Sequence, residues 1–308
     1  MSKQRIDFEQ SCVIDESDIG SYLVEVENFE ETVKLAIKTY IIRVKNGSTR
    51  EYDFTEFVGD QLMRYVFSSD KIDKLYDDKK APHRIAQRRA GFKKDHIRDG
   101  KLGELILFLI MEGFYRFPLA CHKLNTKQSH SQEVLGADGL FFGEWKGDDY
   151  LAIGESKIYS DCMRGLREAL DSILRFHGPG AVNALDQDMK IVRNNPSGNL
   201  DPPLLDHLLS NLNDFSSLRR LYPIFVCYEE DNFQNILQEE TDDGQIIEAM
   251  EEIVTKNDHS SRVNRAFNSE RERVKQDQLH FIFLPVKNAD DFRERLKRAV
   301  FPRFEDIT

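Results

Sequence analysis

Two uninterrupted apolar runs constrain the fold of this chain more than any other feature. They are LYPIFVCY at 221–228 and LHFIFLPV at 279–286. Both have the length of a strand and are apolar at successive positions, as in strands that are buried on both faces of a sheet. Charged helical patterns lie between and after them. The sequence therefore predicts an α/β fold, in which helices flank a mixed central sheet.

A second group of elements precedes these runs. The segment GELILFLIMEGF (103–114) is apolar on nearly every side and predicts a buried helix. Two strands are predicted at 137–142 and 150–159, separated by the turn-rich GEWKGDD. Ser160 or Asp161 can cap the amphipathic helix that follows.

The first 95 residues carry a different pattern, which predicts an α-rich region. Its predicted helices are 29–44, 53–67 with Asp53 as N-cap, and a third helix after Pro82. We therefore expect two parts, an N-terminal region at 1–95 that contacts DNA or a partner and a core at 96–308.

The charges of the chain are unevenly distributed. The net charge is −11, but residues 79–101 hold nine Lys and Arg against two Asp, whereas 229–258 hold eleven carboxylates against one Lys. A local basic patch can bind phosphates on an acidic chain, because such contacts act over about 8–10 Å. The candidate DNA contacts are Arg88, Arg89, Lys93, Lys94 and, further on, Lys127.

The bulk features indicate a cytoplasmic protein. No run approaches the ~20 apolar residues of a membrane-spanning helix, and the N-terminus lacks the apolar stretch of a signal peptide. The four cysteines lie far apart without CxxC or zinc spacing, as expected for reduced thiols.

The pattern with the clearest chemistry is an E-x-K in an apolar strand. D-x-K or E-x-K occurs six times, but only Glu155 and Lys157 lie within such a strand, LAIGESKIY. Alternation places both on one face, whereas Ala152, Gly154 and Ser156 face the other way and leave room for a helix.

The preceding strand brings a second carboxylate to this pair. A hairpin centred on Gly147-Asp148 places Asp138 opposite Lys157, and a shift by one pair places it opposite Glu155. Asp138 and Glu155 can hold Mg²⁺, a hard cation that prefers oxygen ligands, with Mn²⁺ as a substitute. Lys157 can orient water or stabilise the charge that develops on a phosphate.

Three nearby residues are further candidates. Glu104 is the only ionisable group between Leu102 and Met111 in the apolar helix, where an unpaired carboxylate is costly. It is therefore either a metal ligand or a partner in a cap or ion pair. Glu133 and Lys127 are either additional site residues or surface residues.

The quoted segments resemble a known family. The runs GADGLFF (136–142) and LAIGESKIYSD (151–161), the helix MRGLREALDSI and the earlier GELILFLI are similar to the D/ExK nuclease subunit of the Hachiman antiphage defence system, HamA. The resemblance covers roughly residues 95 to 290. One departure is Ala137, where proline often precedes the aspartate, which keeps Glu133 as a candidate for the first carboxylate.

The resemblance implies a restriction-endonuclease-like core, Mg²⁺-dependent DNA cleavage and a superfamily-2 helicase (HamB-like) as partner. It assigns catalysis to Asp138, Glu155, Lys157 and Glu104. Two other interpretations stay open, namely a site-specific restriction endonuclease with the same site and a non-catalytic interaction subunit in which the Glu–Lys pair is structural.

Overall fold

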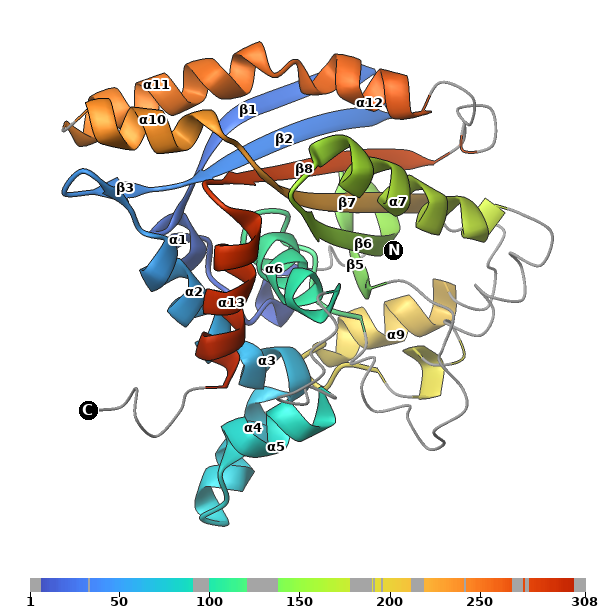
Figure 1. Cartoon of the computed structure of the whole chain (residues 1–308). Helices are drawn as coiled ribbons and strands as arrows, with labels where there is room; N and C mark the ends of the chain where they lie inside the picture. Colours follow the sequence, from blue (N-terminus) through green and yellow to red (C-terminus); the bar gives the residue numbers. More distant parts are fainter. Residues whose placement is uncertain are drawn as a thin grey trace.

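A mixed six-stranded sheet forms the centre of the computed structural model (Figure 1). The structure describes residues 7–32, 34–90, 100–120, 138–177, 190, 192–194, 196–211, 219–240, 242–267, 274 and 277–301. The expected α/β class is confirmed. The strands, in their order across the sheet, are β1 (Leu23–Thr32), β2 (Leu35–Ile42), β8 (Gln278–Val286), β7 (Arg219–Glu229), β6 (Asp148–Tyr159) and β5 (Gly139–Trp145). A separate small hairpin consists of β3 (Val44–Lys45) and β4 (Ser48–Thr49).

The four inner strands run parallel, and the two outer strands are antiparallel to their neighbours. Both predicted apolar runs are confirmed as the adjacent inner strands β7 and β8, and β8 is buried at every position. Helices cover both faces of such a sheet because neither face can be left to water.

The helices form two main layers. One face carries α6 (Gly100–Gly113), α2 (Glu51–Asp60) and α13 (Ala289–Val300), and the other carries α7 (Cys162–Leu174) and α12 (His259–Phe267). Around them lie η1 (Glu9–Ser11), α1 (Glu16–Gly20), α3 (Leu62–Val66), α4 (Ser69–Asp77), α5 (Pro82–Arg89), η3 (Arg175–His177), α9 (Pro202–Asn211), α10 (Asn232–Glu239) and α11 (Asp243–Lys256). Within the described residues, none of these helices has the length and apolar character needed to cross a bilayer.

The predicted helix at 29–44 is wrong. This segment forms the end of β1 and all of β2, and β2 pairs in parallel with β8, so that Leu35 lies opposite Leu279. Its apolar residues match a helical spacing locally, but several are β-branched, and the strand that stabilises them lies about 240 residues further along the chain. Short apolar runs are ambiguous in this way.

The N-terminal region holds helices α1 to α5 and, in addition, these two strands of the central sheet. The helix predicted at 53–67 is present as α2 and α3, but α2 begins at Glu51, so the N-cap position is Arg50 and not Asp53. Asp53 instead pairs with Arg50 at 2.9 Å. The division at residue 95 stays a prediction.

The predicted apolar helix is confirmed as α6, and its buried carboxylate ties two other segments to it. Glu112 is 1% exposed and accepts the backbone N–H groups of Val13 at 2.8 Å and Leu119 at 3.0 Å. Burial raises the pKa of Glu112 to about 7, although these backbone donors oppose the shift. One carboxylate thus fixes both the chain that leads to α1 and the chain that leaves α6.

We expect Glu112→Gln to lower the unfolding free energy by about 2 kcal/mol at neutral pH, because the amide has one acceptor fewer for buried donors. Thermal unfolding and hydrogen exchange at Val13 and Leu119 would measure the loss, and Glu252→Gln on the exposed surface of α11 is the control. Because the folded pKa is raised from 4.5 to about 7, the ionisation of Glu112 removes stability as pH rises through that window. The stability of the glutamine variant should not show this loss between about pH 4.5 and 7. If the variant and the wild type had the same pH profile of stability, the raised pKa of Glu112 would be contradicted.

Candidate functional site

The β5–β6 hairpin fixes the positions of the candidate residues. Lys146 and Gly147 form its two-residue turn with φ of 52° and 85°, and Trp145 pairs with Asp148. This turn type requires positive φ at both positions. The register continues to the pair Gly139–Gly154, and the N–H of Asp138 donates to the carbonyl of Gly154 at 2.8 Å.

This is the register in which Asp138 comes next to Glu155, although the last pair of the ladder is Gly139–Gly154 and Asp138 itself bonds to Gly154. Of the two predicted registers, the second is therefore the one found. Beyond Gly154, β6 keeps β7 as a neighbour, with Glu155 opposite Ile224, whereas the ladder with β5 has ended. Within the described part of the chain, the E-x-K pair thus lies where one edge of β6 has no strand beside it.

Glu155 and Lys157 form a close ion pair under α7. The Nζ of Lys157 lies 2.5 Å from Oε1 of Glu155, and their side chains are 20% and 5% exposed. Burial and the nearby carboxylate of Asp138 raise the pKa of Glu155, against the opposing effect of Lys157. For Lys157, burial lowers the pKa, but the carboxylate of Glu155 outweighs it and the net shift is upward. Ser172 of α7 also lowers the pKa of Glu155 to a smaller extent, while its hydroxyl donates to the carbonyl of Glu168 at 3.1 Å.

Asp138 is held by the residue between the pair. Its Oδ2 accepts the backbone N–H of Ser156 at 2.8 Å and the Ser156 hydroxyl at 2.9 Å. As predicted, the alternate residues of β6 face a closely packed helix, because α6 approaches Ser156 through Gly103 and Gly154 through Leu107. Asp138, Glu155 and Lys157 are therefore brought together at one end of the hairpin.

Glu104 takes a different partner. It lies in the first turns of α6, next to Gly103, and the hydroxyl of Tyr65 in α3 donates to its Oε2 at 3.1 Å. Among the described residues, no three His, Cys, Asp or Glu side chains are grouped so as to hold a metal ion. A direct metal contact by Glu104 stays a prediction, as does the alternative that Glu104 is an ion-pair or capping residue.

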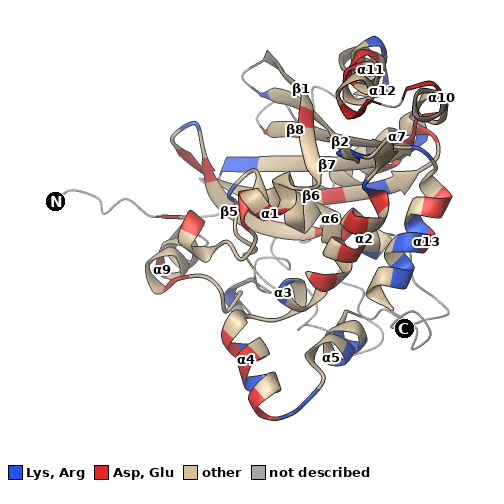
Figure 2. Cartoon of the chain, turned by 90° about the vertical axis from the view of Figure 1, so that its left-hand side faces the viewer, with Lys and Arg blue, Asp and Glu red and all other residues tan. Residues whose placement is uncertain are grey.

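Of the other candidate residues, the structure describes only Arg88 and Arg89. Arg88 and Arg89 are exposed at the end of α5, and Arg89 also lies over the ring of Phe67 at 5.0 Å. Helices α4 and α5 project from the body of the molecule (Figure 1), and basic residues colour α5 in Figure 2. Lys93, Lys94, Lys127 and Glu133 lie outside the described residues.

Sequence reasoning missed the residues that support the site. The strand pattern only places Ser156 on the face that packs against a helix, and it does not single out Ser172. Neither has a sequence signal, because a serine between Glu and Lys or on a helix face is ordinary. Only the hairpin register and the packing of α7 bring them to Asp138 and Glu155.

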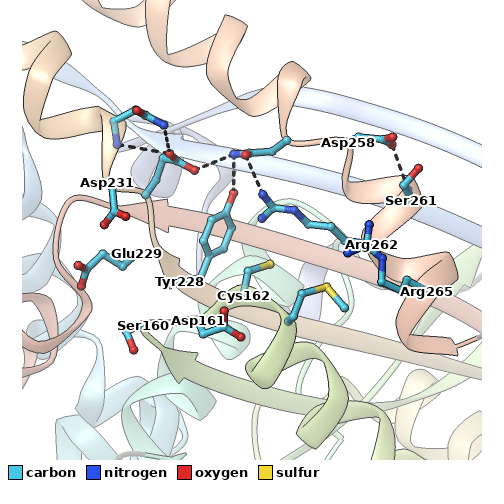
Figure 3. A pocket seen from close by; sticks show the side chains of 14 residues that line it. Ser160, Asp161, Cys162, Tyr228, Glu229, Asp231, Asp258, Ser261, Arg262 and Arg265 are labelled. Carbon is cyan, nitrogen blue, oxygen red and sulfur yellow. Dashed lines mark hydrogen bonds between the residues drawn. The ribbon is translucent and has the colours of Figure 1, made fainter.

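A separate cavity of about 800 Å³ lies at the carboxyl ends of β6 and β7 (Figure 3). Its lining includes five carboxylates and two arginines, namely Asp161, Glu229, Glu230, Asp231, Asp258, Arg262 and Arg265. At its base, Tyr228 bonds to the buried His259 at 2.9 Å. The acidic segment at 229–258 thus begins in this cavity and continues along α11, where Figure 2 marks further Asp and Glu positions in red. Such a lining disfavours phosphate.

Comparison with known proteins identifies one family. No curated protein matches the chain significantly. The model of the HamA family matches residues 18–300. This range spans the sheet from β1 to β8, both helical layers and the Asp138–Glu155–Lys157 cluster. Since the match covers nearly the whole sequence, the chain belongs to the HamA family.

Proposed function

We propose that this chain is a Mg²⁺-dependent DNA nuclease and the effector subunit of a Hachiman antiphage defence complex. The observation that carries the proposal is the convergence of Asp138, Glu155 and Lys157 at the point where β5 leaves β6. Membership of the HamA family supports it, because this family suggests a component of that defence system.

The donor set fits a hard divalent cation. Asp138 and Glu155 would hold Mg²⁺ or Mn²⁺, and Mg²⁺ sites commonly use one or two carboxylates together with water and substrate oxygens. The mutual repulsion of these carboxylates contributes to the raised pKa of Glu155, and a bound cation would offset it. When bound, the metal supplies Lewis-acid polarisation of the phosphate and a water of lowered pKa. Glu104 is the proposed third acidic residue.

The protein's own groups have distinct tasks. Lys157 neutralises Glu155 in the free protein, and its partly exposed ammonium group can donate to a phosphate oxygen as negative charge increases there. Ser172 lies beside Glu155 on the helix side, and Ser156 restrains Asp138 through its N–H and its hydroxyl. Because these restraints exist before substrate binds, little reorganisation is needed during the reaction.

The proposal includes a partner. A superfamily-2 helicase, HamB-like, would restrain or activate the nuclease, since an unrestrained DNA nuclease harms its own cell. The test uses linear and circular DNA with Mg²⁺, in the presence and absence of this partner. We expect metal-dependent cleavage without strong sequence preference, giving a smear of products. Cleavage of pure DNA into discrete bands would instead indicate a site-specific restriction endonuclease.

The second rival is a non-catalytic interaction subunit with a structural Glu–Lys pair. Calorimetric titration with Mn²⁺ discriminates, because two converging carboxylates should bind the ion and a buried salt bridge alone should not. If Mn²⁺ does not bind and DNA stays intact in the complete complex, this rival is correct.

We expect the basic segment at 79–101 to contact DNA or the partner. Arg88→Glu with Arg89→Glu should weaken DNA binding or complex assembly in a salt-dependent way, because lost phosphate contacts reduce the release of counterions. Lys93→Glu and Lys94→Glu should add to the loss. Binding is measured by fluorescence anisotropy at several salt concentrations.

The control for this experiment reverses two exposed basic residues elsewhere, Lys256→Glu in α11 and Arg298→Glu in α13. It changes the net charge by the same amount and should have a smaller effect. Equal losses in both variants, or none at low salt, would show that the segment is only a solvated surface.

A further inference from the structure

The end of the β5–β6 ladder leaves a backbone donor that the proposed site uses. In an antiparallel pair, the N–H groups of alternate residues face the neighbouring strand. Gly154 faces β5 and accepts the N–H of Asp138, so Ser156, two residues later, faces the same side. Its N–H donates to the carboxylate of Asp138 at 2.8 Å. The strand edge itself therefore helps to hold this carboxylate.

The side chain of Ser156 adds a second donor to the same oxygen. The hydroxyl lies 2.9 Å from Oδ2 of Asp138, and Ser156 is completely buried. A backbone N–H and a hydroxyl that converge on one oxygen restrict the rotation of the carboxylate. Because both bonds use Oδ2, Oδ1 is the oxygen that can turn toward a cation.

Helix α6 restricts the hydroxyl from the other side. A Cβ atom added at Gly103 would lie 2.9 Å from the Ser156 Oγ and 3.1 Å from its Cβ. Only glycine lets the helix approach this closely. The Ser156 hydroxyl also lies 3.5 Å from the carbonyl of Gly100. The serine is thus packed between the first turn of α6 and Asp138, with little space for another rotamer.

We infer that Ser156 is a positioning residue that orients Asp138 for a divalent cation, and that Gly103 keeps the Ser156 hydroxyl in place. The inference rests on the proposed function, since it assigns a role within the same metal site. Groups that orient metal ligands contribute about 10- to 100-fold to metal affinity. Ser156, the middle residue of the E-x-K, would then orient Asp138, the first carboxylate of the site.

The test is Mn²⁺ titration of the full-length protein by calorimetry, together with thermal unfolding without metal. Ser156→Ala removes the hydroxyl but keeps the N–H, so we expect about tenfold weaker binding at a nearly unchanged melting temperature. Gly103→Ala should also weaken binding, because its methyl group displaces the hydroxyl. The matched control is Ser160→Ala, an exposed serine just after the same strand, which should bind like the wild type.

A double variant separates positioning from packing. In the double variant Ser156→Ala with Gly103→Ala, the added methyl group occupies the space of the missing hydroxyl. Its melting temperature should therefore lie closer to that of the wild type than the melting temperature of Gly103→Ala alone. Its Mn²⁺ binding should stay as weak as that of Ser156→Ala alone. Wild-type affinity in a folded Ser156→Ala protein would overturn this inference and leave the proposed function intact. If the wild type itself binds no Mn²⁺, both are overturned.

Discussion

We expect the replacement of Glu155 with glutamine to abolish the proposed metal-dependent DNA cleavage by the complete complex. The amide keeps the volume of the side chain and an oxygen that accepts from Lys157, but it removes the charge that a metal ligand needs. The loss of such a group should raise the barrier by about 3–4 kcal/mol, a decrease in rate of roughly a hundred- to a thousandfold. Rates are measured on labelled DNA with Mg²⁺ and with Mn²⁺.

The fold should tolerate this change. Burial and Asp138 both disfavour the charged form of Glu155, so the melting temperature of Glu155→Gln should hold or rise slightly. Asp138→Asn should be equally inactive. The control is Glu144→Gln, in the exposed E-x-K of the hairpin turn, which should keep activity within a few-fold. Full cleavage by a folded Glu155→Gln complex would contradict the assignment of Glu155 to the active site. If only Glu133→Gln lost cleavage activity, the first carboxylate of the site would be Glu133 and not Asp138.

We expect the replacement of Lys157 with methionine to have a comparably large effect on the proposed cleavage and a pH-dependent effect on stability. Methionine fills the space of the lysine stem but removes the cation, so the rate should again fall by about a hundred- to a thousandfold. Without Lys157, the remaining influences on Glu155, burial and Asp138, raise its pKa further.

A carboxyl with a raised folded pKa adds stability below its unfolded pKa, and this stability is lost as pH rises through the folded value. The deficit of Lys157→Met relative to the wild type should therefore be larger at pH 8 than at pH 5 in thermal unfolding. Lys146→Met, in the turn, is the control. An equal deficit at both pH values would mean that Lys157 does not compensate the charge of Glu155.

The apolar strand around one E-x-K was enough to select the candidate site from sequence. This context separated Glu155 and Lys157 from five similar tripeptides, and the alternation along the strand predicted that Ser156 faces a closely packed helix, which is confirmed. The α/β class followed from the apolar runs of β7 and β8, because strands without a polar face must be buried on both sides. The apolar runs and the alternation within a strand depend only on neighbouring residues, so they can be recognised in the sequence alone.

Only the tertiary structure decided which residues meet. The choice between two hairpin registers depended on a turn centre that shifts by one residue, and the Lys146-Gly147 turn sets the register that brings Asp138 to Gly154 and Ser156 of β6. The segment at 29–44 became strand because β8 supplies its partner from the far end of the chain. Likewise Tyr65 reaches Glu104, Ser172 reaches Glu155 and α6 packs on Ser156. Each contact joins residues distant in sequence, and their packing has no signature in any local pattern.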